Sequence, residues 1–162
     1  ARTIAAGGVA TAAIVLAGAA GARVWVTARS PQKRAQALEL GADQAFEAGA
    51  RLPERVDVVL ETVGRATWGH SIRSLAPGGT LVLSGATTGD ASPAELTRIF
   101  FLQLSVLGST MGSREELERL IRFCVKTGIR PVIDRTLPLP EAREGFQAML
   151  DGGFLGKIVF TV

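Results

Sequence analysis

Short apolar runs alternate with segments of helical periodicity along most of this 162-residue chain. The runs at residues 23–27, 56–60 and 80–84 are too apolar for surface strands, and they are typical of strands buried in a parallel sheet. Between these runs, apolar residues recur at the spacing of amphipathic helices. This alternation predicts an α/β fold, a doubly wound parallel sheet with helices on both faces.

Capping signals indicate where several helices begin. Ser30 precedes a proline, which is a favourable helix start, and Thr67 begins a helix that we expect to end at residues 77–79. Residues 92–95 and 113–116 have the pattern of capping boxes. Each of these positions therefore predicts the amino end of one helix.

Three of the predicted helices carry apolar residues that we expect to face the core. These residues are Val9, Ala13, Leu16, Ala17 and Ala20 in the first helix, Trp68, Ile72 and Leu75 in the helix after Thr67, and Leu117, Leu120, Ile121, Cys124 and Val125 in the helix after residue 113. Cys124 is thus expected in the core, with a reactive thiol as the minor alternative.

The segment at residues 3–13 joins a short apolar run to the first helix through Gly7 and Gly8. Glycines at a strand-to-helix turn let the backbone approach a pyrophosphate closely, and the positive end of the helix faces the same anion. The match to the G-x-G-x-x-G pattern is partial, because Ala5 and Ala10 occupy its outer positions. An Ala/Gly-rich turn before a packed helix explains the stretch equally well.

The residues after the second strand bear on the adenosine end of a dinucleotide. In NAD-binding folds an acid about 20 residues beyond the glycine turn binds the ribose hydroxyls. Here that place holds Arg29 and Ser30, and Lys33 and Arg34 follow one turn later. A hydroxyl at a helix start with nearby cations suits a 2′-phosphate, which favours NADPH over NADH and disfavours S-adenosylmethionine. The alternative is a solvated helix start.

Composition narrows the classes of function. The net charge is +3 and the basic residues are spread along the chain, which argues against a nucleic-acid surface. The longest apolar stretch, residues 12–20, is too short for a membrane span, and we expect no signal peptide. A single cysteine fits a cytoplasmic location. Because Cys124 and His70 are the only residues of their types, this chain cannot form a zinc site from Cys and His ligands.

The regular alternation of strands and helices ends after residue 130, where three prolines precede a predicted helix at residues 141–150 and a strand at residues 157–160. We therefore divide the chain into a dinucleotide-binding domain, residues 1–130, and a C-terminal tail, residues 131–162. Several segments then match one family in order; they are AAGGVA (5–10), GARV (21–24), ELGAD (39–43), VDVVLETVG (56–64), LAPGGT (75–80) and GKIVF (156–160).

Together these segments resemble the cofactor-binding Rossmann domain of a medium-chain dehydrogenase/reductase, of the quinone oxidoreductase-like branch of the zinc-binding dehydrogenases. The turn in that branch is typically Ala-Ala-x-Gly-Gly-Val-Gly, so only Ala10 departs from it. The resemblance implies cofactor contacts at Gly7, Gly8 and Val9 (pyrophosphate), Ser30 and Lys33 (2′-phosphate), Thr62 and Val63 (adenosine and ribose), and Ser84, Gly85, Ala86, Ser109 and Thr110 (nicotinamide).

The resemblance also implies a homodimer. The strand at residues 104–109 resembles the edge by which family members pair two subunits, and an apolar edge strand left unpaired is a hazard. The family's N-terminal domain, which shapes the substrate site and holds zinc in some branches, has no counterpart in this sequence. The tail resembles the segment that completes that domain, so its packing is not predicted.

No catalytic residue or metal ligand is expected in this chain. Hydride transfer needs no protein nucleophile, Glu61 is expected to bond to nearby backbone, and His70 to lie at the surface or cap a helix. Lys157 is expected on the last strand, pointing outward or, by resemblance, near the cofactor. We expect the NADPH-binding part of an oxidoreductase that transfers hydride between NADPH and a quinone, enone or other carbonyl compound, inactive by itself. The alternative is a stand-alone nucleotide-binding or dimerisation module.

Overall fold

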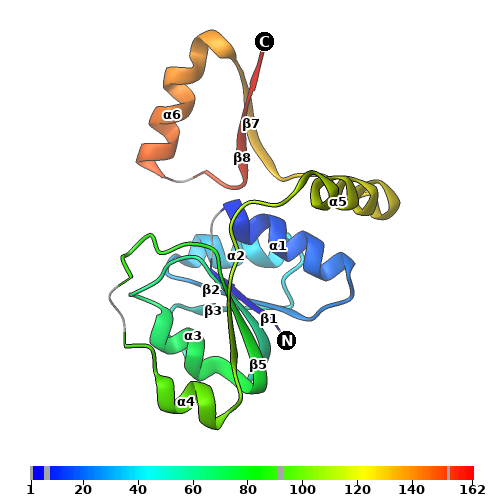
Figure 1. The fold of residues 1–162 in the computed structure, drawn as a ribbon. Coiled ribbons are helices and arrows are strands. Elements are labelled where there is room, and N and C mark those ends of the chain that lie inside the picture. The colour runs from blue at the N-terminus through cyan, green and yellow to red at the C-terminus, as the bar shows by residue number, and fades with distance from the viewer. Residues whose placement is uncertain (1, 6–7, 91–92, 153) are drawn as a thin grey trace.

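The computed structural model describes residues 2–5, 8–90, 93–152 and 154–162, and for residues 2–5 it describes the backbone. A six-stranded parallel sheet forms the body of the molecule, with its strands in the order β3-β2-β1-β4-β5-β6 (Figure 1). The predicted doubly wound α/β fold is therefore confirmed. The strands are β1 (Arg2–Ala5), β2 (Val24–Ala28), β3 (Gln44–Glu47), β4 (Val56–Glu61), β5 (Leu75–Leu83) and β6 (Ser105–Gly108).

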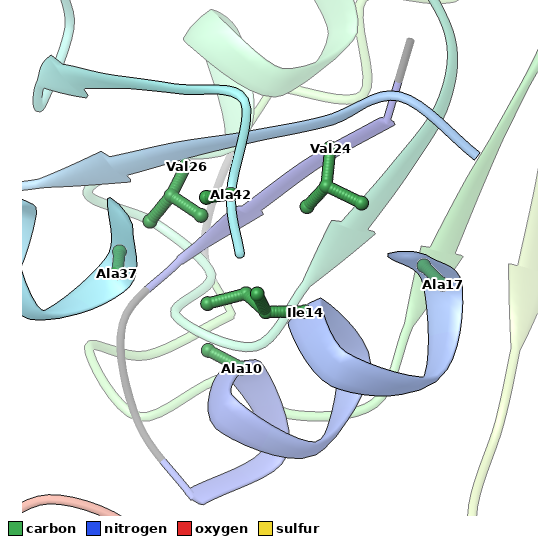
Figure 2. Packing of buried hydrophobic residues seen from close by; sticks show 7 residues of the cluster. All are labelled: Ala10, Ile14, Ala17, Val24, Val26, Ala37 and Ala42. Atoms are coloured by element: carbon green, nitrogen blue, oxygen red, sulfur yellow. The ribbon is translucent and has the colours of Figure 1, made fainter. Parts of the chain in front are cut away.

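Helices α1 (Gly8–Ala19) and α2 (Pro31–Glu39) cover one face of this sheet. Figure 2 shows Ala10, Ile14 and Ala17 of α1 directed toward Val24 and Val26 of β2. The alanines let the helix lie close to the strands, because a small side chain holds the two backbones at a short distance.

The buried face of α1 differs from the predicted one. Val9 is 50% exposed and Ala20 is exposed, whereas Ala10 and Ile14 are buried; of the predicted set only Ala17 is buried. The reason is that almost every position of α1 is apolar or small. Apolar spacing cannot select a face when there is no polar face to contrast with it.

The opposite face of the sheet is covered by α3 (Trp68–Ser74) and α4 (Leu96–Phe101). Ile72 and Leu75 are fully buried there with Leu81. The helix after Thr67 was predicted to run to residues 77–79, but it ends at Ser74. Leu75 pairs with Val56 of β4, so the chain enters the sheet directly and the paired backbone cannot continue the helix.

Two further helix predictions need correction. The predicted capping box at 92–95 does not start a helix: Ser92 lies outside the described residues, and Glu95 has a left-handed backbone (φ 56°) directly before Leu96. A residue in that conformation cannot belong to a right-handed turn. The capping box at 113–116 is confirmed, because Ser113 Oγ accepts from Glu116 N (3.2 Å) and the Glu116 carboxylate accepts from Ser113 N (2.8 Å).

Helix α5 (Arg114–Thr127) does not bury its predicted stripe. Leu117, Ile121 and Val125 are 56%, 53% and 79% exposed, and Cys124 is only half-buried. The prediction that Cys124 lies in the core is therefore wrong. The pattern made α5 an amphipathic helix, but the described residues bring no element over its apolar face.

The tail forms a separate unit (Figure 1). Strand β7 (Ile133–Pro138) pairs in parallel with β8 (Lys157–Thr161), and a 3₁₀ turn (Leu139–Glu141) leads into α6 (Ala142–Asp151). The helix and the last strand lie near their predicted positions, whereas β7 was not foreseen. Among the described residues, no helix combines the length and apolarity needed to cross a bilayer.

Candidate nucleotide-binding site

At the carboxyl ends of the strands, a cavity of about 660 Å³ lies beside β2 and β4. This is where strand order reverses between β1 and β4, the position at which open α/β sheets bind ligands. Four predicted cofactor residues line this cavity; they are Arg29, Ser30, Lys33 and Val63. Among the lining residues that the structure describes, none is an Asp or Glu.

Ser30 and its basic neighbours have different roles. Ser30 is the N-cap of α2 and accepts from Lys33 N through its hydroxyl (3.4 Å). Arg29 and Lys33 are exposed at the mouth of the cavity. Arg34 instead turns back, and its guanidinium donates to the carbonyls of Ala28 (2.8 Å) and Arg29 (3.1 Å). The cations available to a bound anion are therefore Arg29 and Lys33.

Buried Glu61 holds two residues that line the cavity, Val63 and Thr67. Its Oε1 accepts from Val63 N (2.7 Å), Gly64 N (3.1 Å) and Thr67 Oγ1 (2.8 Å), and its Oε2 accepts from Ser71 Oγ. These bonds agree with the expectation that Glu61 binds nearby backbone. Because both carboxylate oxygens are engaged and Glu61 is 2% exposed, it holds the turn after β4 and is not placed for acid–base chemistry.

Two other contacts fix the loops around this cavity. Gly64 has φ +87°, and a Cβ there would lie 2.6 Å from the Gly89 carbonyl, so the close approach of the two loops requires glycine. Thr88 Oγ1 donates to the Val63 carbonyl (2.8 Å) and accepts from Ala66 N (3.0 Å). The cavity wall is thus preorganised by the close packing at Gly64 and by hydrogen bonds between the Thr88 side chain and the backbone.

A second hollow, about 440 Å³, lies at the carboxyl ends of β5 and β6. It brings together all five residues predicted for the nicotinamide, Ser84, Gly85, Ala86, Ser109 and Thr110. The two strand ends are joined by the bond from Ser109 N to the Leu83 carbonyl (2.8 Å). Gly85 packs on Thr62, since a Cβ at Gly85 would lie 2.9 Å from the Thr62 carbonyl.

Only the helical side of the predicted pyrophosphate turn is described. Gly7 lies outside the described residues, while Gly8 and Val9 begin α1. Lys157 of β8 reaches this point: its Nζ lies 3.4 Å from the position that a Cβ on Gly8 would take. Sequence reasoning left the direction of Lys157 open, because only the folded chain brings residue 157 to residue 8.

The other ionisable candidates are structural. His70 Nε2 lies 2.8 Å from the Ala50 carbonyl, which ties α3 to the loop between β3 and β4. The described residues contain no group of three or more His, Cys, Asp and Glu side chains that could hold a metal ion. The described part of the chain therefore does not fit a zinc site, whereas its glycine-led helix and paired hollows do fit a dinucleotide.

This sheet order and a helix led by Gly8 define a Rossmann-type nucleotide-binding domain. The chain belongs to the zinc-binding dehydrogenase family, whose family model matches residues 8–126. It is 29% identical to an acryloyl-coenzyme A reductase of Metallosphaera sedula, over 98% of this chain and 49% of that protein.

Solved structures agree with this assignment. An NAD-dependent alcohol dehydrogenase is 32% identical with a TM-score of 0.86, covering 99% of this chain and 50% of its own. A crotonyl-CoA carboxylase/reductase, AntE in complex with NADP, has a TM-score of 0.90 at 22% identity, over 99% and 49% of the two chains, and shows the shared fold. The chain spans about half the length of the relatives it matches.

Proposed function

We propose that this chain is the NADPH-binding part of an oxidoreductase that transfers hydride between NADPH and a quinone, enone or other carbonyl compound. The observation that carries the proposal is the cavity at the ends of β2 and β4, where Arg29, Ser30 and Lys33 stand without a lining carboxylate. A phosphate on the adenosine ribose is stabilised by two cations and a helix start. The described residues of that wall include no acid, which would favour the free ribose hydroxyls of NADH.

The names of the relatives support an oxidoreductase reaction, but they do not point to one substrate. Their names include an acryloyl-coenzyme A reductase and an NAD-dependent alcohol dehydrogenase, both oxidoreductases. Because the second of these uses NAD, the choice of NADPH rests on this chain's own residues. The single half-buried cysteine is in keeping with a cytoplasmic enzyme.

When bound, the nicotinamide would supply the hydride donor or acceptor. The protein's part is orientation: the N–H groups at the start of α1 and the Lys157 ammonium attract the bridging phosphates, while Arg29 and Lys33 hold the adenosine end. Ser84 and Ser109 line the hollow at the other end. These contacts fix both ends of one extended molecule, which sets the position of the ring between them.

We also propose a homodimer through β6. This strand is the outer edge of the sheet, and Val106 and Leu107 are 40% and 53% exposed. An edge with free backbone groups and apolar side chains is a ready template for pairing with a second copy. Two-fold pairing of β6 would join two sheets into one and cover these side chains.

Calorimetric titration with NADPH and NADH tests the cofactor proposal. We expect the wild-type chain to prefer NADPH and Ser30→Asp to weaken NADPH binding about tenfold or more, because a carboxylate repels the 2′-phosphate. Ser113→Asp is the matched control, since Ser113 is also a helix N-cap but lies on α5. Equal binding of both cofactors would remove the claim for NADPH, and binding of neither would favour a stand-alone module.

A further inference from the structure

The tail reaches back onto the cofactor turn through one short segment. Residues 154–156 join α6 to β8, and they line a small cavity of about 100 Å³ together with Gly8, Thr11 and Lys33. The Gly156 carbonyl lies 3.7 Å, and Lys157 Nζ 3.4 Å, from the position of a Cβ on Gly8. This turn therefore decides where the Lys157 ammonium lies.

The ammonium lies in an unfavourable place for a cation. The first N–H groups of α1 and the helix dipole make the amino end of α1 positive, and Lys157 adds a further positive charge there. Lys157 is exposed, so its ammonium keeps contact with water while it lies beside the start of α1. The backbone position of residues 155–157 therefore decides whether the ammonium reaches α1.

Asp134 restrains that backbone position. Its Oδ1 accepts from Leu155 N (3.0 Å) and its Oδ2 from Arg135 Nε (2.8 Å). The adjacent bond from Lys157 N to the Val132 carbonyl (2.9 Å) continues the pairing of β7 with β8. The Asp134 side chain is 19% exposed, and its bond to Leu155 lies at the surface of the tail.

We infer that Asp134 is a positioning residue for the cofactor's bridging phosphates: by holding Leu155 N it sets the turn that directs Lys157 onto the start of α1. This inference rests on the proposed NADPH function and deepens it. The tail is then part of the cofactor site. The binding affinity of a ligand that reaches Lys157 should depend on Asp134, whereas the affinity of a ligand that does not reach Lys157 should not.

Two ligands separate these cases. In the proposed site NADPH would extend from the cavity at Arg29 and Lys33 to the start of α1, whereas adenosine 2′-monophosphate carries the 2′-phosphate but no bridging phosphates. Loss of a hydrogen bond to a charged group weakens binding about tenfold. We therefore expect Asp134→Ala to weaken NADPH about tenfold and to leave adenosine 2′-monophosphate within about twofold. Asp134→Asn, which keeps an acceptor oxygen, should recover part of the loss.

A double-variant cycle tests whether Asp134 acts through Lys157. In a Lys157→Gln background, Asp134→Ala should cost NADPH little further affinity, because the charge it positions is already gone. Asp151→Ala is the matched control, since Asp151 is a tail aspartate whose carboxylate bonds within α6 to Gln147 Nε2 (2.8 Å). Thermal unfolding of each variant, followed by Trp25 and Trp68 fluorescence, verifies that the sheet is folded.

Each outcome decides the inference. Equal weakening of both ligands by Asp134→Ala, full additivity with Lys157→Gln, or unchanged NADPH affinity would overturn it while the proposed function stands. If the wild-type chain binds neither NADPH nor adenosine 2′-monophosphate, the proposed function fails and this inference fails with it. Selective, non-additive loss of NADPH affinity would establish Asp134 as a positioning residue.

Discussion

The sheet of β1–β6 and the segment from α5 to β8 both carry apolar side chains, but the two regions differ in what covers those side chains. In the sheet, Trp25, Ile72 and Leu81 are at most 2% exposed. Of the described residues from 114 onward, only Gly145 and Gly156 are buried. An amphipathic pattern thus tells which face of a helix is apolar, whereas burial depends on whether the rest of the chain supplies a partner for that face.

Different interactions therefore stabilise each of the two regions. The sheet rests on continuous apolar burial on both faces. The tail rests on the pairing of β7 with β8, on the contact of the Phe146 and Phe160 rings (5.8 Å between centroids), and on the hydrogen bond that Leu155 N donates to Asp134. Few buried contacts and exposed hydrogen bonds mark a region of low local stability, so the tail should open before the sheet unfolds.

The largest expected effect comes from one residue type placed in each region. Ile72 of α3 is fully buried, whereas Ile121 of α5 is 53% exposed. Ile72→Ala should lower the free energy of unfolding by about 2–5 kcal/mol, through lost burial and the cavity left behind. Ile121→Ala should change it by less than about 1 kcal/mol, because little apolar surface is lost and alanine favours the helix. Chemical denaturation of the two variants measures both values.

Equal losses for the two isoleucines would contradict the comparison. A large loss at Ile121 in particular would mean that the α5 stripe is covered in solution, either by a second copy or by another part of the protein. Repeating the Ile121→Ala measurement over a range of protein concentrations separates these cases, since cover by a second copy makes the loss depend on concentration.

Most of the sheet could be predicted from the sequence, because each buried strand is a short apolar run. The alternation of strands and helices along the chain also allows few sheet topologies. Local capping at Ser30 and Ser113 was also readable, since it involves residues three apart. Prediction failed where the outcome depended on distant partners. The end of α3 was set by pairing of Leu75 with Val56, and β7 by pairing with a strand that comes later in the chain.

The residues of the candidate site also fall into those that local sequence predicts and those that depend on distant partners. Arg29, Ser30 and Lys33 lie together because they are neighbours in sequence, and Ser84 lies beside Ser109 because parallel strands end at one edge of the sheet. The approach of Lys157 to Gly8 depends on the packing of the tail, which no local pattern reports. The assigned cofactor contacts stay predictions until the titrations are done.

A smaller loss of stability, confined to the tail, is expected when Gly156 is replaced by alanine, and Gly128 is its matched control. Gly156 (φ +93°) and Gly128 (φ +75°) would both strain an alanine, by about 1–2 kcal/mol. Only at Gly156 would the added Cβ also clash, lying 2.2 Å from the Val132 carbonyl. Gly156→Ala should therefore separate β8 from β7, while Gly128→Ala should not. Limited proteolysis of residues 130–162 detects the separation, and unchanged tail cleavage in Gly156→Ala would contradict it.

The smallest effect concerns pH and again affects the tail alone. Bonds from Leu155 N and then from Arg135 lower the pKa of Asp134 below its ordinary value of 3.8. These bonds exist only in the folded tail, so the unfolded tail binds a proton more readily. The stabilisation is therefore fully present above pH 3.8 and is lost as the pH falls through the lower folded-state pKa.

NMR of the Leu155 amide should show a titration with its midpoint below 3.8 that vanishes in Asp134→Asn. Tryptophan fluorescence should stay constant over the same range, because Trp25 and Trp68 lie in the sheet region. A midpoint at or above 3.8, or a simultaneous change in fluorescence, would mean that the tail and the sheet respond to acid as one unit.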